Sequence, residues 1–198
     1  MGKAVIFDFG GVLAEEGFRE GLKAIAERNC LDPEEFFRFA ADLIYETGYV
    51  TGAARETVYL DRLREETGIR ESNRMIRDEI LTRFVLRPDV IVYVEELKSE
   101  GLSTAILSDQ TNWLDELNEK DPFFHHFDHV FNSFRIGKGK RDPSVFGDVC
   151  LKMGVKPGET VFVDDNIDNV KRASGEGLNA VLYTELIELK TEIKKYLT

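Results

Sequence analysis

The hydrophobic pattern of the chain changes character twice. Residues 3–8 open it with a short apolar run that ends in Asp8, which is typical of a buried strand. From about residue 15 to residue 86, apolar side chains recur at helical spacing and predict four amphipathic helices in succession. From Pro88 onward, short apolar runs alternate with helical segments. We expect the strands of this part at 103–108, 129–132, 160–164 and 179–183.

The fold expected from this pattern is α/β, with a doubly wound, Rossmann-like parallel sheet and right-handed crossovers. The four helices come directly after the first strand, so we expect a helical-bundle cap inserted into this core. The predicted core comprises residues 1–14 and 87–198, and the predicted cap comprises residues 15–86. Helix-end signals support the cap, since Asp32 before a proline is a typical helix start and Gly68 a typical helix end.

The charge and composition of the chain narrow the classes of partner. The 198 residues carry a net charge of −11, which argues against nucleic acid and membrane surfaces but allows a small anionic substrate. No apolar run reaches the length of a membrane span, and Cys30 and Cys150 lack the spacing of a metal or redox site. We therefore expect a cytoplasmic protein with two unpaired thiols. The sequence leaves the oligomeric state open.

Polar residues follow three of the expected strands at the points where the strands end. In chain order they are Asp8, Ser108, Asp109, Asp164 and Asp165, and Lys140 lies in a glycine-rich loop before a further helix. Each has a structural alternative, since serine and aspartate also cap helices and a loop lysine is usually solvated. The carboxyl ends of parallel strands nevertheless meet at one edge of a sheet, where ligands bind in open α/β folds. We therefore expect these side chains to form one site.

Four motifs in this order resemble those of the haloacid dehalogenase-like (HAD) hydrolase superfamily, and the resemblance covers essentially the whole chain. The motifs are VIFDFGGV at 5–12, AILSD at 105–109, GKGKRDPSVF at 137–146 and VFVDDNIDN at 161–169. The helices inserted after the first motif resemble the cap of the subgroup that contains sugar-phosphate phosphatases and the phosphatase domain of soluble epoxide hydrolases. The resemblance implies a phosphatase of small phosphorylated metabolites.

The resemblance also implies a magnesium site. A phosphate monoester repels an incoming anion, so Asp8 can act as the nucleophile only if its charge is offset. A Mg²⁺ ion between Asp8 and the phosphoryl oxygens would offset it, because hard cations prefer oxygen ligands. The further ligands implied are the backbone carbonyl of Gly10 and a carboxylate of Asp164 or Asp165.

The remaining roles implied by the resemblance concern the phosphoryl group. The Ser108 hydroxyl would donate to a phosphoryl oxygen, together with backbone N–H groups near Phe9 and Asp109. Lys140 would balance the remaining negative charge and hold Asp8 against the acidic pair. The first chemical step would form an aspartyl phosphate on Asp8, which water hydrolyses in the second.

One residue departs from the superfamily pattern in a way that affects turnover. Its phosphatases usually carry a second aspartate two residues after the nucleophile, which protonates the leaving alkoxide and then activates water, but this chain has Gly10 there. The change keeps a backbone carbonyl for the metal and removes a general acid–base, a group typically worth about 10²–10⁴-fold in rate. Glu15, Glu16 and Asp109 are the candidates to replace it. Arg141 stands where relatives often have proline. Its guanidinium near the cavity mouth could contact an anionic substrate, but we expect the side chain in solvent.

Two other functions stay open on the sequence alone. A 2-haloacid dehalogenase displaces halide from carbon with an aspartate nucleophile and needs neither a metal nor a second aspartate, so Gly10 fits it. The pair Asp164–Asp165 does not, because a metal-free site gains nothing from extra anions beside its nucleophile. The other alternative is a low-turnover phosphate-binding or partner-binding domain, which Gly10 also supports.

Overall fold

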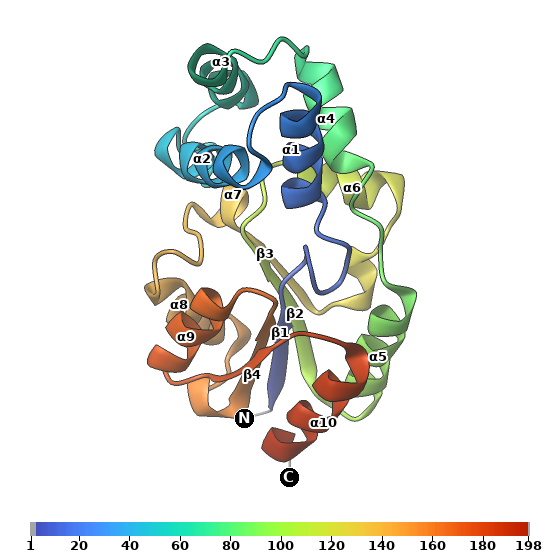
Figure 1. Cartoon of the computed structure of the whole chain (residues 1–198). Coiled ribbons are helices and arrows are strands. Elements are labelled where there is room, and N and C mark those ends of the chain that lie inside the picture. Colours follow the sequence, from blue (N-terminus) through green and yellow to red (C-terminus); the bar gives the residue numbers. More distant parts are fainter. Residues whose placement is uncertain (1–2, 198) are drawn as a thin grey trace.

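A single parallel sheet of five strands forms the centre of the protein (Figure 1). The computed structural model describes residues 3–197. The strands are β1 (Ala4–Phe7), β2 (Ser103–Ser108), β3 (His129–Asn132), β4 (Thr160–Asp164) and β5 (Asn179–Leu182), in the order β3-β2-β1-β4-β5. The chain runs outward from β1 to β3 and then returns to place β4 on the other side of β1. This confirms the doubly wound α/β fold and puts its switch point, where such folds bind ligands, between β1 and β4.

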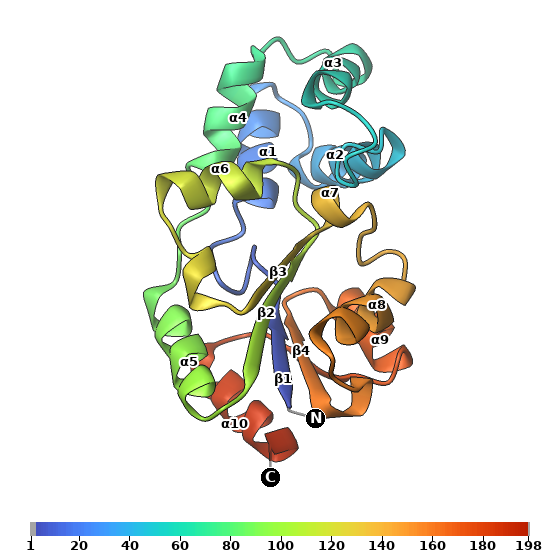
Figure 2. The ribbon, with the colours of Figure 1, turned by 180° about the vertical axis from the view of Figure 1, so that it is seen from behind.

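Helices cover both faces of the sheet, as strands that are apolar throughout require. They are α5 (Pro88–Ser99) and α10 (Leu186–Leu197) on one face, and α8 (Ser144–Met153) and α9 (Ile167–Gly175) on the other. The two pairs lie on opposite sides of the sheet in Figures 1 and 2. Within β1, Val5 and Phe7 enter the core under α5 and α10, whereas Ile6 enters the core under α8 and α9. Alternate residues of one strand therefore supply two separate cores.

A few short elements complete the core. They are α6 (Trp113–Lys120), α7 (Ser133–Ile136) and the 3-10 turns Phe124–His126 and Pro157–Glu159. The sequence pattern gave no sign of α7 or of the two turns. A single turn of helix such as α7 is too short to show a period, which explains the omission. Within residues 3–197, none of the helices has the length and apolar character that a bilayer crossing needs.

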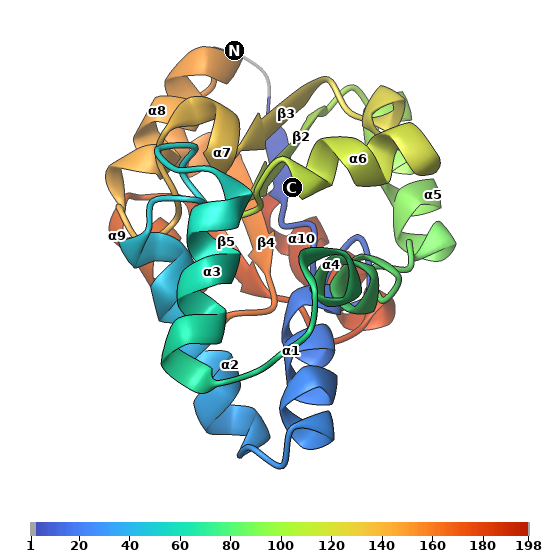
Figure 3. The ribbon, with the colours of Figure 1, turned by 90° about the horizontal axis from the view of Figure 1, so that it is seen from above.

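Four helices between β1 and β2 form the insertion that the sequence predicted. They are α1 (Gly17–Arg28), α2 (Pro33–Glu46), α3 (Glu56–Thr67) and α4 (Asn73–Leu81), and α1 contacts both α2 and α4. The Asp32 carboxylate caps α2 by accepting the N–H of Glu35 at 2.8 Å, and Gly68 ends α3 with a φ of 76°. The helices lie beyond the carboxyl ends of the strands (Figures 1 and 3). We keep residues 15–86 as the proposed extent of the cap.

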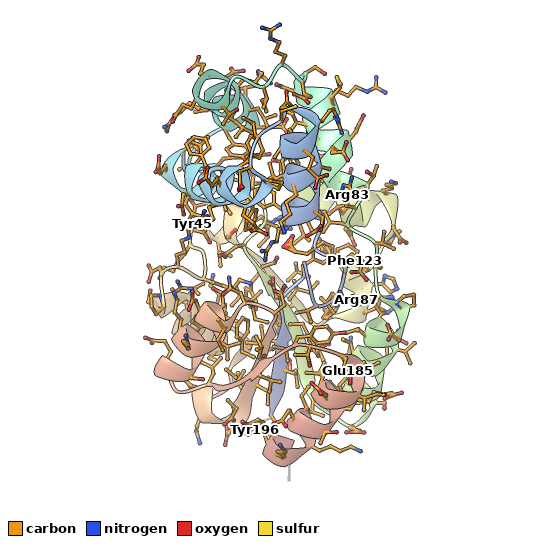
Figure 4. All side chains as sticks on the ribbon, viewed as in Figure 1. Tyr45, Arg83, Arg87, Phe123, Glu185 and Tyr196 are labelled. Carbon is orange, nitrogen blue, oxygen red and sulfur yellow. The ribbon has the colours of Figure 1, made fainter. Side chains whose placement is uncertain are left out.

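The two chain segments that join core and cap lie side by side. Ala14, on the way out, forms an antiparallel bridge with Leu86, on the way back, and the N–H of Glu15 donates to the carbonyl of Val85 at 2.9 Å. The guanidinium of Arg87, labelled in Figure 4, donates to both carboxylate oxygens of Glu15 at 3.1 and 3.0 Å. The chain therefore enters and leaves the cap at one hydrogen-bonded junction.

Candidate active site

A cavity of about 470 Å³ lies between the cap and the carboxyl ends of the strands. Its core side is polar and includes Asp8, Ser108, Asp109, Lys140 and Asp165. Its cap side is largely apolar and includes Phe18, Phe37, Ile44 and Val50. The structure therefore brings the strand-end residues into one cavity and closes it with helices from a different part of the chain. The volume suits a small organic ligand.

Asp8 lies at the exit of β1 and is held on both sides. Its Oδ1 accepts the backbone N–H of Phe9 at 2.7 Å, and its Oδ2 lies 2.9 Å from the ammonium nitrogen of Lys140. Burial raises the pKa of Asp8 well above its ordinary value, and the charges of Asp164 and Asp165 raise it further against the opposing effect of Lys140. An ionised Asp8 therefore needs more positive charge than Lys140 supplies.

Lys140 is a buried cation shared by two carboxylates. Its Nζ lies 2.9 Å from Asp8 Oδ2 and 2.7 Å from Asp164 Oδ2, and only 2% of its side chain is exposed. Burial lowers the pKa of Lys140, but the charges of Asp164 and Asp8 outweigh it and leave the pKa well above the ordinary value. The loop ahead of α8 thus delivers a permanent positive charge to the ends of β1 and β4.

The acidic pair after β4 has two distinct environments. Asp164 is fully buried, and its Oδ1 accepts the N–H of Asn166 at 2.8 Å. Asp165 is exposed and leans over Gly11, where an added Cβ would clash with the Asp165 carboxylate. Gly11 also has a φ of +79°, so both the backbone and the carboxylate above it require glycine. Gly11, in the first motif, therefore leaves space for the carboxylate of Asp165, in the fourth motif.

Three carboxylates of this site fit a divalent cation. Asp8, Asp164 and Asp165 each offer an oxygen within 4.8 Å of the others, and no second group of this kind occurs in residues 3–197. Together with one ammonium, from Lys140, the three carboxylates leave a net charge of −2. Oxygen ligands with a surplus of two negative charges match the preference of Mg²⁺. Gly10, whose backbone carbonyl the sequence predicted as a further donor, also lines the cavity.

The predicted phosphate-binding groups differ in what holds them. Ser108 ends β2 and is buried, and it lines the cavity. The Phe9 N–H donates to Asp8 itself. The Asp109 carboxylate accepts the N–H of Lys140 at 2.8 Å and the hydroxyl of Tyr45 from the cap. Asp109 thus links α2 to the loop that carries the lysine, a contact between distant segments that the sequence did not indicate.

The structure separates the three carboxylates that could replace the acid missing at Gly10. Glu15 points to Arg87 and is 58% exposed, and Asp109 is engaged as described. Glu16 lines the cavity with Gly10, and burial raises its pKa to about 7. The Glu16 carboxylate accepts the backbone N–H groups at the start of α1, which oppose this rise, while the charge of Asp165 adds to it.

Arg141 is 45% exposed, as expected of a side chain in solvent, and it also contacts the cap. Its guanidinium stacks over the ring of Tyr45 at 3.9 Å and donates to Asp42 at 2.8 Å. The side chain of Tyr45, labelled in Figure 4, therefore connects α2 with the core loop that carries Arg141. The arginine that replaces the usual proline is a contact between core and cap at the cavity.

Comparisons with known proteins show the family of this chain. The family described as haloacid dehalogenase-like hydrolase matches residues 3–174. The phosphoserine phosphatase of Thermus thermophilus is 30% identical over 91% of this chain and 81% of its own length. The bifunctional epoxide hydrolase 2 of Rattus norvegicus is 30% identical over 50% of this chain, but the match spans only 19% of that protein.

A solved structure supports the fold. The HAD family enzyme bt-2542 of Bacteroides thetaiotaomicron, in complex with magnesium and inorganic phosphate, has a TM-score of 0.72 and 23% identity. The likeness covers 93% of this chain and 95% of that one. The superfamily resemblance of the four motifs is thus confirmed by the family match and by the inserted cap. The chain belongs to the haloacid dehalogenase-like hydrolases.

Proposed function

We propose that the protein is a Mg²⁺-dependent phosphatase that acts on small phosphorylated metabolites through an aspartyl phosphate on Asp8. The observation that carries this proposal is the charge arrangement around Asp8. Lys140 and two further carboxylates surround it, and the carboxylates outnumber the cation. A site that binds a metal ion with its substrate uses such a surplus of negative charge, whereas a metal-free nucleophile gains nothing from it. It therefore disfavours the dehalogenase alternative.

The residues that would hold Mg²⁺ are Asp8, Asp164, Asp165 and the carbonyl of Gly10. When bound, the ion would supply positive charge that offsets the repulsion between Asp8 and the phosphoryl oxygens. The chain itself supplies the orientation of the nucleophile. The Phe9 N–H fixes Oδ1 of Asp8, and Lys140 fixes Oδ2 at 2.9 Å. This leaves the carboxylate at the floor of the cavity.

The first step would be attack of an Asp8 oxygen on phosphorus, with departure of the alcohol. Lys140 and the Ser108 hydroxyl are the positively charged and neutral donors available to the phosphoryl oxygens at the strand ends. Because both are buried, their orientation is set before the substrate arrives. Water would attack the aspartyl phosphate in the second step and release inorganic phosphate.

The cavity also suggests the chemical class of the alcohol. The cap side of the cavity is lined by Phe18, Phe37, Ile44 and Val50. Apolar walls gain free energy when they cover apolar substrate surface, at about 25 cal/mol per Å². We therefore expect a phosphate monoester whose organic part has an apolar face, rather than one that is charged all around.

The test is a screen of phosphorylated metabolites with purified protein and Mg²⁺. Wild type should release phosphate from a subset of them, chelator should abolish the release, and Asp8→Asn should be inactive while folding normally. Dehalogenation of 2-chloropropionate that survives chelator would replace the phosphatase proposal with the dehalogenase alternative. A stable phosphate on Asp8 without turnover would favour the binding-domain alternative.

A cytoplasmic location is also part of this proposal. Both cysteines, Cys30 and Cys150, are unpaired thiols, which fits a reducing compartment.

A further inference from the structure

The side chain of Glu16 lies directly beside the position of the missing aspartate of the first motif. A Cβ built on Gly10 would lie 3.5 Å from Glu16 Oε1 and 3.7 Å from Glu16 Cδ. Gly10 lacks the positive φ found at Gly11, so its backbone would accept an L-residue. The neighbours that an aspartate would meet are this carboxylate and the ring of Phe84, at 3.3 Å. A carboxylate is therefore present beside position 10. It belongs to Glu16, the residue that precedes the first helix of the cap.

The local structure holds Glu16 in this place. It is the N-cap of α1, and its Oε1 accepts the N–H of Phe18 at 3.1 Å and of Arg19 at 3.3 Å. Among residues 3–197, Oε2 has no hydrogen-bond partner, and the carboxylate belongs to no ion pair. One oxygen is thus fixed by the helix, and the other has no protein partner among the described residues. This is the arrangement expected of a group that exchanges a proton with a substrate.

The neighbouring carboxylates are already engaged. Glu15 pairs with Arg87 at 3.0 Å, and Asp109 accepts the N–H of Lys140 and the hydroxyl of Tyr45. The described cluster of metal-binding carboxylates does not include Glu16 either. Glu16 therefore lines the cavity with Asp8 and, apart from capping α1, is not engaged by an ion pair or by the acidic cluster.

We propose that Glu16 is the general acid–base of this enzyme; the proposal rests on the phosphatase function above. In the first step an Asp8 oxygen bonds to phosphorus, the bond from phosphorus to the leaving oxygen breaks, and the carboxylic acid of Glu16 gives its proton to that oxygen. In the second step the Glu16 carboxylate takes a proton from water as the water oxygen bonds to phosphorus and the bond to Asp8 breaks. Phosphate leaves, and Glu16 is protonated again.

The test uses the dependence of the rate on the leaving group. Glu16→Gln keeps an oxygen for the N–H groups of α1 but cannot transfer a proton. It should lower kcat/KM for alkyl phosphates by about 10²–10⁴-fold. The loss should be much smaller for p-nitrophenyl phosphate, whose leaving group needs no protonation. Glu15→Gln, one residue away and paired with Arg87, is the matched control and should keep the wild-type leaving-group dependence.

A second measurement follows the phosphorylated enzyme. Without a base for water, Glu16→Gln should accumulate phosphate on Asp8, which shows as a burst of p-nitrophenol and as added mass on the intact protein. An aspartate restored at position 10 should reverse both the loss of rate and the accumulation of phosphorylated enzyme. Gly10→Asp in the Glu16→Gln background should regain part of the lost rate, whereas Gly10→Asp alone should not exceed wild type.

The outcomes separate the two proposals. Wild-type protein that neither turns over any phosphate ester nor becomes phosphorylated on Asp8 overturns the phosphatase function. An active wild type with an equal loss for alkyl and p-nitrophenyl phosphates in Glu16→Gln, and no phosphorylated enzyme, overturns the role of Glu16 alone. Wild type that stops at the phosphorylated enzyme also overturns it, since the acid–base would then be absent.

Discussion

The ammonium of Lys140 lies 2.9 Å from the carboxylate of Asp8, and both side chains are buried at the switch point of the sheet. Lys140→Met keeps the aliphatic stem and removes the charge, so it leaves two carboxylates without their cation. We expect it to lower the free energy of unfolding of the metal-free protein by about 3–5 kcal/mol. Phosphatase activity should fall by about 10²–10³-fold, the typical loss for one electrostatic donor.

Denaturant unfolding and steady-state kinetics measure these two effects. Lys138→Met is the matched control, because Lys138 is two residues away and pairs only with Asp148 and Ser144 on the surface. A change of similar size in both variants would contradict the special place of Lys140.

Magnesium should stabilise the folded protein through the acidic cluster. Saturation to 100 times the dissociation constant would raise the free energy of unfolding by about 2.7 kcal/mol, because the ion binds the folded state. Asp165→Asn should reduce the rise in melting temperature that Mg²⁺ produces. Asp168→Asn, three residues on and outside the cluster, should keep the full rise. Thermal melts with and without EDTA make the comparison, and equal responses in the two variants would refute the proposed ligand set.

The raised pKa of Glu16 predicts a pH-dependent stability in the metal-free protein. Burial places the folded-state pKa at about 7, against 4.5 for an ordinary glutamate. The unfolded chain therefore releases this proton first, and stability falls as pH rises from about 4.5 to about 7. Glu16→Gln removes this loss, so its stability relative to wild type should rise over that range by up to about 3 kcal/mol and then level off.

Glu15→Gln should show the opposite trend in the same melts. The hydrogen bond from Arg87 lowers the pKa of Glu15, so this pair contributes stability above that pKa and loses it in acid. Since Glu15 is exposed, the effect should be small, with the variant weaker than wild type at neutral pH and equal to it in acid. Parallel curves for the two variants would contradict the assignment of Glu16 as the buried carboxylate.

The hydroxyl of Tyr45 should couple the cap to the core. Tyr45→Phe removes its hydrogen bond to the Asp109 carboxylate, a charged-partner bond worth about 1.5–3 kcal/mol. We expect lower stability and a raised KM, because Asp109 also holds the backbone of Lys140. Tyr49→Phe is the matched control, since it removes a neutral bond to Asn112, and neither of these two residues lines the cavity. An unchanged KM in Tyr45→Phe would contradict the coupling.

The chain pattern alone was enough for the sheet and for the meeting of its strand ends. Asp8 directly follows one strand, and Ser108 and Asp164 end two others, all three with clear apolar runs. Parallel pairing then brings their side chains to one edge. The insertion was equally visible, because helical periodicity replaces strand periodicity directly after the first motif. These features depend on local sequence and on a general property of parallel sheets.

What the sequence did not settle depends on contacts between cap and core. Glu15 and Glu16 are adjacent glutamates, and only the direction in which α1 starts decides that one turns to Arg87 and the other to Gly10. The places of Tyr45 and Arg141 follow in the same way from how α2 docks on a loop about 100 residues later. The hydrophobic periodicity of these two segments does not predict how they pack against each other.

The junction at Ala14 and Leu86 makes the cap a module, since the chain enters and leaves it at adjacent points. Exchange of such a module between related proteins would normally be expected to alter substrate choice and to leave the chemistry of the core intact. Glu16 lies just beyond the junction, on the cap side. In this protein, exchange of the cap would also remove Glu16, the proposed proton donor. Such an exchange would therefore change turnover together with substrate selectivity.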